Sequence, residues 1–101
     1  MTLSDIKNRL KTTGFPVAYR AFNEPTALPF IVYLSDGDTN FSADGTVYFA
    51  AHKVRIELYT GERNLSAEAK IEAVLSDVYF EKSTTYIDAE KVYETIYELE
   101  V

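Results

Sequence analysis

The amino-acid sequence predicts an α+β domain, in which an antiparallel sheet of about five strands carries two packed helices in the order α-β-β-β-α-β-β. Two segments place apolar residues at helical spacing, whereas the others alternate apolar and polar residues or form short apolar runs typical of strands. Short turns between the strands favour an antiparallel meander. With 101 residues, of which 47% are hydrophobic, residues 1–101 are expected to form one domain.

The two helices are expected at residues 3–12 and at about 66–79. Thr2 or Ser4 can cap the first helix, and Gly14 ends it. Its apolar face consists of Leu3, Ile6 and Leu10. The second helix carries an apolar stripe that is expected to cover the sheet. That stripe consists of Ile71, Val74, Leu75 and Val78.

The remaining periodic segments are expected to be strands. The first begins near Phe15, and the apolar run of residues 29–34 predicts a buried, central strand. Residues 47–60 form the longest strand, whose alternation predicts one buried face and one wet face. A short strand at 83–87 and a last strand at about 91–101 complete the sheet.

Residues 35–46 (SDGDTNFSADGT) form the only long polar stretch and are expected to be an extended loop. Oxygen-bearing side chains recur there at Asp36, Asp38, Asn40, Ser42 and Asp44, as at the start of an EF-hand calcium loop. The match breaks, because Phe41 and Val47 stand where that motif requires Gly and Glu. No calcium or other cofactor is therefore expected. The loop is expected to be mobile in the free subunit and to order against a partner, with Phe41 as its anchor.

Composition excludes several classes of function. The net charge of -6 argues against specific nucleic-acid binding, since affinity for nucleic acid comes largely from Lys and Arg. With no cysteine, disulfides, thiol nucleophiles and thiolate zinc sites are excluded. The sequence has no apolar run long enough to span a membrane, and its polar N-terminus differs from a signal peptide. We therefore expect a protein that is cytoplasmic when made.

The sequence carries no recognisable catalytic motif. His52 is the only histidine and lies within a predicted strand, where a packed or exposed role is more common than catalysis. Carboxylates are so numerous, 16 in all, that any proposed acid–base pair would be non-specific. The chain is therefore expected not to be an enzyme.

One face of the sheet is expected to be strongly charged. Lys53 and Arg55 on the long strand can meet Glu94 and Glu98 on the last strand. Two interpretations remain open: a solvated face, or a face or edge reserved for a neighbouring subunit. The second interpretation makes these four residues, with Asp36, Asp38, Phe41 and Asp44 of the loop, the candidate residues for protein interaction.

Several short stretches of the sequence are distinctive when taken together. They are residues 14–19 (GFPVAY), 29–34 (PFIVYL), 41–45 (FSADG) with Tyr48, 56–60 (IELYT) and 96–101 (IYELEV). These stretches resemble a family of small prophage proteins from Gram-positive bacteria, namely head-to-tail joining, tail-completion or tail-terminator proteins. The resemblance covers nearly the whole chain, and the stretches that carry it are structural motifs without catalytic residues.

The resemblance implies a virion morphogenesis protein that forms a ring, with six subunits as the expected number, at the end of the tail tube. Its implied partners are other copies of itself, tail-tube proteins and neck or connector proteins, and its implied final location is the virion tail or neck. An acidic balance also suits a channel through which DNA slides. Two alternatives remain: a free-standing phage-encoded binding or regulatory module, and, more remotely, an enzyme.

Overall fold

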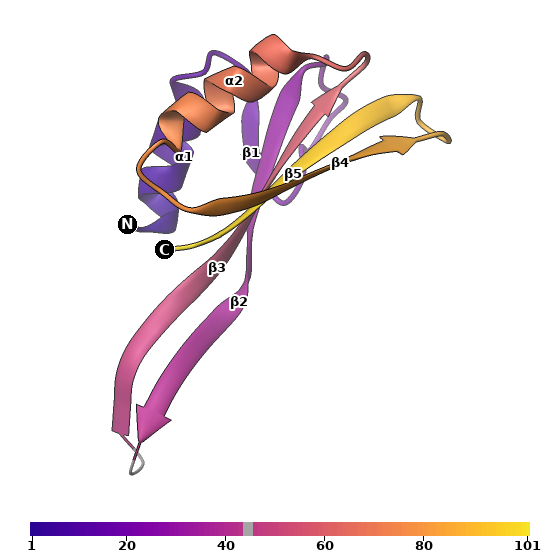
Figure 1. Cartoon of the computed structure of the whole chain (residues 1–101). Helices are drawn as coiled ribbons and strands as arrows, with labels where there is room; N and C mark the ends of the chain where they lie inside the picture. The colour runs from indigo at the N-terminus through magenta and orange to yellow at the C-terminus, as the bar shows by residue number, and fades with distance from the viewer. Residues whose placement is uncertain (44–45) are drawn as a thin grey trace.

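The computed structural model describes the backbone of residues 1–43 and 46–101, and the side chains of residues 1–35 and 53–101. Within these residues, seven elements follow one another along the chain (Figure 1). They are helix α1 (Leu3–Lys11), strands β1 (Val17–Tyr19), β2 (Phe30–Ala43) and β3 (Thr46–Thr60), helix α2 (Leu65–Val74), and strands β4 (Phe80–Ile87) and β5 (Val92–Glu100). This order confirms the predicted α+β arrangement.

The described strands form one five-stranded sheet in the order β1-β2-β3-β5-β4. The pairs β2–β3, β3–β5 and β5–β4 are antiparallel, as predicted. The three-residue strand β1 differs, because it pairs with β2 in parallel, with Val17 opposite Ile31. Residues 20–29 provide the longer connection that a parallel pair requires. The sheet is therefore mixed, with its only parallel pair in the described chain at the β1 edge.

Helix α1 is fixed at both ends by its own sequence. The Thr2 hydroxyl accepts from the amide of Asp5, and the Asp5 carboxylate accepts from the amide of Thr2, which is a complete capping box. These hydrogen bonds from Thr2 lower the pKa of Asp5. At the other end Gly14 has a φ of +87°, a conformation that glycine adopts without strain. Both predicted end signals are confirmed.

Helix α2 is shorter than predicted. Asn64 caps its N-terminus by accepting from the amide of Ala67, and the helix ends at Val74 with Leu75 as its C-cap. Leu75 is nevertheless fully buried, as is Ile71. Val74 and Val78 pack against the same core while remaining partly exposed, so the predicted apolar stripe is confirmed.

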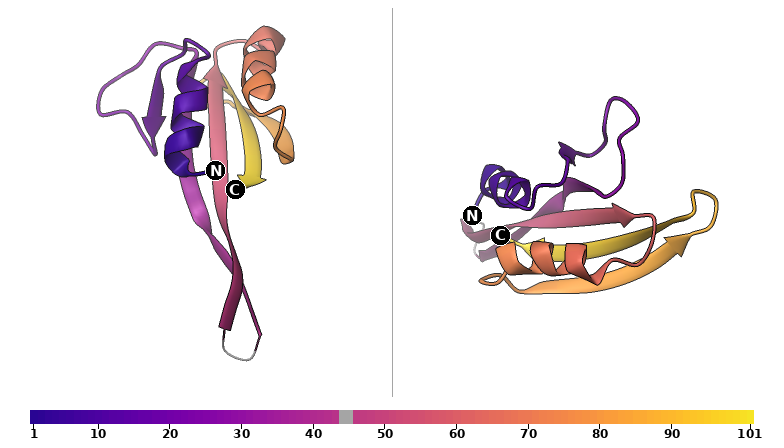
Figure 2. Two further views of the ribbon diagram at one scale, coloured as in Figure 1. Left: turned by 90° about the vertical axis from the view of Figure 1, so that its left-hand side faces the viewer. Right: turned by 90° about the horizontal axis from the view of Figure 1, so that it is seen from above.

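Both helices pack on the same face of the sheet (Figure 2). Alternate residues of β2, β3 and β5 point toward the helices, as the period of two in a strand requires. The buried core consists of Ile6, Leu10, Ile31, Tyr33, Val54, Ile56, Leu58, Ala67, Ile71, Leu75, Tyr97 and Leu99. We call this side of the sheet the helix face, and the opposite side the open face.

Strands β2 and β3 continue beyond the body of the molecule as a two-stranded arm, which consists of residues 36–43 and 46–52 (Figure 1). In the described backbone, β1 ends opposite Tyr33 and β5 ends opposite Lys53, so that β2 and β3 pair only with each other in the arm. The register shifts by one residue at Asp36, between Ser35 and Gly37, which marks a β-bulge at the root of the arm.

The predicted loop at residues 35–46 is therefore wrong. Strand β2 extends to Ala43 and β3 begins at Thr46, which leaves Asp44 and Gly45 outside the described residues. Gly, Asp and Asn have low strand propensity, but that propensity depends strongly on context. Backbone pairing with the apolar start of β3 determines the structure here.

Candidate interaction surface on the open face

The open face brings together the four charged residues that the sequence placed on one side of the sheet. Arg55 lies directly opposite Glu98, as predicted, whereas Glu94 lies four residues away along β5, opposite Tyr59. Lys53 lies opposite Glu100 at the root of the arm. The strand register therefore places Arg55 against one of its predicted acidic neighbours, and Lys53 against a carboxylate that was not predicted.

The ion pair of Arg55 is with its own strand. Its Nε lies 2.8 Å from an Oε of Glu57, whose side chain is only 12% exposed. Glu98 has Arg55 on one side, and on the other side it lies directly opposite Glu81 of β4. Directly opposed like charges destabilise a sheet. The open face thus contains an acidic pair, Glu81 and Glu98, while the nearby Arg55 forms its ion pair with Glu57.

Tyr59 lies at the centre of the open face between two carboxylates. Its hydroxyl is 2.6 Å from an Oε of Glu94 and 2.9 Å from an Oε of Glu57, and it can donate its single hydrogen to one of them at a time. Burial, followed by these hydrogen bonds, raises the pKa of Tyr59 well above its usual value. The ring of Phe30 stacks on that of Tyr59 with centroids 5.1 Å apart.

A groove of about 680 Å³ lies beside Tyr59, between the open face and the β1–β2 connection. Its apolar lining includes Phe22, Leu28, Phe30, Val32 and Val92. Its carboxylates are Glu24, Glu57 and Glu90, and Arg20 is its one cation among the described lining residues. Val32 is buried although no helix covers this side, because the connection shelters it. The groove can therefore accommodate apolar groups accompanied by positive charge.

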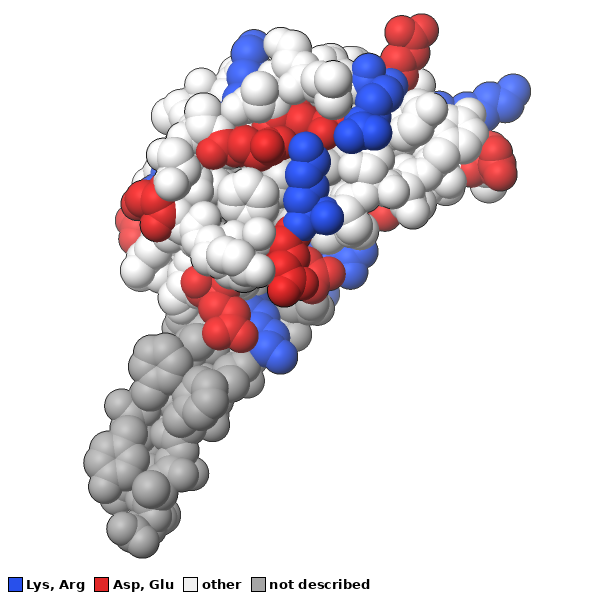
Figure 3. Space-filling model, in the orientation of Figure 1, with Lys and Arg blue, Asp and Glu red and all other residues white. Residues whose placement is uncertain are grey.

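A second hollow, of about 490 Å³, lies where the arm leaves the body. Its lining includes three carboxylates, from Glu81, Glu98 and Glu100, together with Lys53 and the exposed ring of Tyr79. Figure 3 shows acidic side chains at this border of the body, next to the arm. The root of the arm is therefore predominantly acidic in the described residues.

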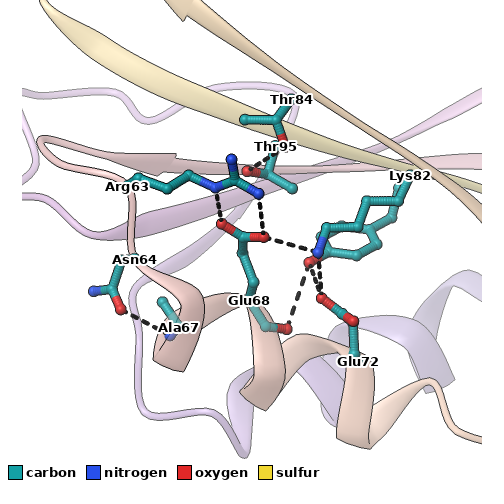
Figure 4. Close-up of polar contacts among 9 residues, drawn as sticks. Arg63, Asn64, Ala67, Glu68, Glu72, Lys82, Thr84 and Thr95 are labelled. Carbon is teal, nitrogen blue, oxygen red and sulfur yellow. Dashed lines mark hydrogen bonds and ion pairs between the residues drawn. The ribbon is translucent and has the colours of Figure 1, made fainter.

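A polar cluster around the buried Glu68 holds α2 against β4 and β5 (Figure 4). Glu68 is 2% exposed and forms ion pairs with Arg63 at 2.7 Å and Lys82 at 2.8 Å. Lys82 also pairs with Glu72, which accepts from the Tyr97 hydroxyl at 2.9 Å. The hydrogen bond from Arg63, supported by Lys82, lowers the pKa of Glu68 against the opposing effect of burial.

This cluster fixes β4, whose outer edge has no neighbouring strand in the described sheet. Lysine side chains commonly protect such edges from further pairing. Lys82 instead points toward α2, where both of its carboxylate partners lie. The cluster therefore serves the packing of the helix on the sheet.

The candidate residues of the arm cannot be placed in the same detail. Asp36, Asp38 and Phe41 lie on β2, with Asp36 at the bulge, and their side chains lie outside the described part. Asp44 lies outside the described residues altogether. Their role in binding a partner stays a prediction.

Sequence reasoning missed the groove and the Glu68 cluster. The groove depends on residues 20–29 folding over the open face, for which the sequence gives no periodic signal. Within the described residues, no group of three or more His, Asp or Glu side chains is placed to hold a metal ion. The helices of that part are too short and too polar to cross a membrane.

Comparison with known proteins gives a likeness of the fold. No protein-family model matches the sequence, and no curated protein matches it significantly. The structure is similar to a chain in the solved virion of a native gene transfer agent (GTA) particle, with a TM-score of 0.64 and 14% sequence identity. The match covers 95% of this chain and 90% of that chain, so the two share a fold over nearly their whole length.

Proposed function

We propose that this protein is a structural component of a phage or phage-like virion. The observation that carries the proposal is the likeness, over 95% of the chain, to a chain of a gene transfer agent virion, which is a phage-like particle. The described surface is consistent with a role in assembly, because it offers shallow charged and apolar areas for contact. We propose no catalytic role for the chain.

Within the virion, we assign the protein to the tail terminator or head-tail joining position, as a ring of subunits at the end of the tail tube. The family resemblance of the sequence supports this position. A closed ring requires two different complementary surfaces on each subunit. The arm and the open face are two such candidates, because they lie in different parts of the molecule (Figure 1). The net charge of -6 is compatible with a channel that DNA traverses.

The arm is proposed to contact a partner in the assembled particle. A two-stranded ribbon is marginally stable in water when nothing packs against it. Asp36, Asp38, Phe41 and Asp44 are the proposed contact residues of the arm, with Phe41 as the anchor because aromatic side chains gain most from burial at an interface. Hydrogen exchange should then be fast in the free arm and slow after assembly, and Phe41→Ala should weaken assembly.

Two observations test the proposed function. Mass spectrometry of purified virions should detect the protein at a few copies per particle, and electron microscopy with tail-tube subunits should show rings or capped tubes. A gene neighbourhood of tail and head proteins is expected as well. Absence from virions, combined with binding to a host protein, would instead favour a free-standing regulatory module and would contradict the proposal.

A further inference from the structure

The strands of the open face carry an excess of carboxylates. Among the side chains described on this face of β3, β4 and β5, five are acidic and two are basic. They are Glu57, Glu81, Glu94, Glu98 and Glu100, against Lys53 and Arg55. Arg55 pairs with Glu57, and Glu94 accepts from Tyr59. The exposed pair Glu81 and Glu98 therefore lacks an ion-pair partner within the described residues.

Helix α1, on the opposite side of the sheet, presents the opposite charge. Lys7 and Lys11 lie four residues apart and are exposed, while Ile6 and Leu10 point into the core. Side chains four residues apart lie on the same side of a helix. Neither lysine has a carboxylate partner in the part of the chain that the structure describes.

The carboxylates of the helix layer do not neutralise these lysines. Asp5 is held in the capping box of α1, and Asp77 is paired with Arg9. Glu68 and Glu72 are held by Lys82. The helix layer therefore offers uncompensated positive charge, whereas the open face offers uncompensated negative charge.

We infer that copies of this protein associate by placing α1 of one subunit against the open face of the next, with Lys7 and Lys11 facing Glu81 and Glu98. The inference rests on the proposed ring and assigns the contact between its subunits to α1 and the open face, instead of to the arm and the open face. Because the two surfaces lie on opposite sides of one subunit, the contact is head to tail, and such contacts close into rings when the rotation permits. The contact also supplies the counter-charge that the Glu81 and Glu98 pair lacks.

Charge reversal tests this contact in both directions. An acidic-face variant, Glu81→Lys with Glu98→Lys, should self-associate at least about tenfold more weakly than the parent, because like charges then face each other. A helix variant, Lys7→Glu with Lys11→Glu, should show the same loss. Sedimentation equilibrium at low ionic strength measures both losses, since salt screens exposed charges.

Restored association between complementary variants is the decisive measurement. An equal mixture of the two variants should associate, because each variant then offers the surface that the other requires. The single chain carrying all four substitutions should associate as the parent does. A control variant, Glu62→Lys with Asp88→Lys, changes the net charge as the acidic-face variant does. It alters two exposed turn residues outside both surfaces and should leave association unchanged.

Cross-linking provides an independent readout. A carbodiimide joins lysine amines to carboxylates in contact, and mass spectrometry of the parent should find Lys7 or Lys11 joined to Glu81 or Glu98 between subunits. Absence of this cross-link at high protein concentration and low salt overturns the inference. Parental association of either charge-reversed variant, or failure of the mixture to associate, overturns it as well.

The inferred contact and the proposed function can fail independently of each other. If virions contain the protein but charge reversal leaves self-association unchanged, the proposed function stands and the inferred contact fails. If charge reversal and restoration behave as expected but virions lack the protein, the contact stands and the virion role fails. Circular dichroism of each variant verifies that the fold is retained.

Discussion

The hydroxyl of Tyr59 lies 2.6 Å from a carboxylate oxygen of Glu94 and links the two central strands β3 and β5 across the open face. Glu57 approaches the same hydroxyl from the side of β3. The phenol hydroxyl therefore lies within hydrogen-bonding distance of carboxylates on both strands. This arrangement makes the hydroxyl more important for stability than its partly exposed position suggests.

Tyr59→Phe should destabilise the protein by about 1 kcal/mol at neutral pH, because the ring is retained while one hydrogen bond to a charged group is lost. Unfolding in urea measures the change. Tyr86→Phe is the matched control, since Tyr86 is exposed at the sheet edge and should tolerate the change with little effect. Equal stabilities of the two variants would show that the Tyr59 hydroxyl contributes nothing.

Alkaline pH should destabilise the fold through its buried tyrosines. Burial, and then the hydrogen bond to Glu72, raises the pKa of Tyr97, and the pKa of Tyr59 is raised similarly. The unfolded chain then loses these protons first, near its ordinary pKa of 10. The free energy of unfolding should fall above that pH by up to about 1.4 kcal/mol per pH unit for each tyrosine.

Tyr97→Phe tests the contribution of one buried tyrosine to this slope. The variant should lose stability less steeply than the parent when urea unfolding is compared between pH 9 and pH 11. Its stability at pH 7 will be lower, because Glu72 loses a hydrogen bond there. The informative quantity is therefore the slope of the free energy of unfolding against pH, and not its value at one pH. Identical slopes would mean that Tyr97 ionises as easily in the folded state.

Glu68→Gln should destabilise the protein by about 1 to 3 kcal/mol at pH 7, because Arg63 and Lys82 lose a buried charged partner. The pKa of Glu68 is lowered in the fold, so its contribution is present above the ordinary value of 4.5 and is lost as the pH falls below it. The free energies of unfolding of the variant and the parent should therefore become more similar at acid pH.

Urea unfolding at pH 7 and pH 3.5 measures this difference. Glu62→Gln serves as the control, because Glu62 is exposed in the turn before α2 and should contribute little at either pH. If Glu68→Gln lowers the free energy of unfolding by the same amount at both pH values, the charge of the carboxylate does not contribute to stability.

Leu75→Ala should cost about 2 to 5 kcal/mol, since Leu75 is fully buried between α2 and the sheet. Leu65→Ala makes the same substitution at an exposed position of the same helix and should change stability little. The midpoints of urea unfolding distinguish the two variants. A parental midpoint for Leu75→Ala would contradict the packing of this segment.

The sequence predicts the body of the fold because its signals there are local. The cap at Thr2 and the glycine at Gly14 bound α1, and the alternation along residues 53–60 sets the two faces of β3. The β3 side of the arm belongs to the strand predicted at residues 47–60. The outer part of β2 could not be predicted, because its polar residues are typical of a loop and only pairing with β3 makes them a strand.

The candidate surface was predicted only in part. Strand periodicity placed Lys53, Arg55, Glu94 and Glu98 on one face, and the register confirms their shared position. Periodicity does not predict which ion pairs form within a face. Arg55, for example, forms its ion pair with Glu57 on its own strand. The opposition of Glu81 and Glu98 was not predicted, because β4 begins at Phe80, three residues before the predicted strand at 83–87.

The bulge at Asp36 marks the point where the arm leaves the body. One residue on β2 is left without a counterpart on β3 there, and a second register shift follows between Phe41 and Ser42. Deleting Asp36 would restore a regular ladder at this point, because Gly37 would then follow Ser35 opposite consecutive residues of β3. Since a bulge bends its strand and increases the local twist, the deletion would change the direction in which the arm projects from the body.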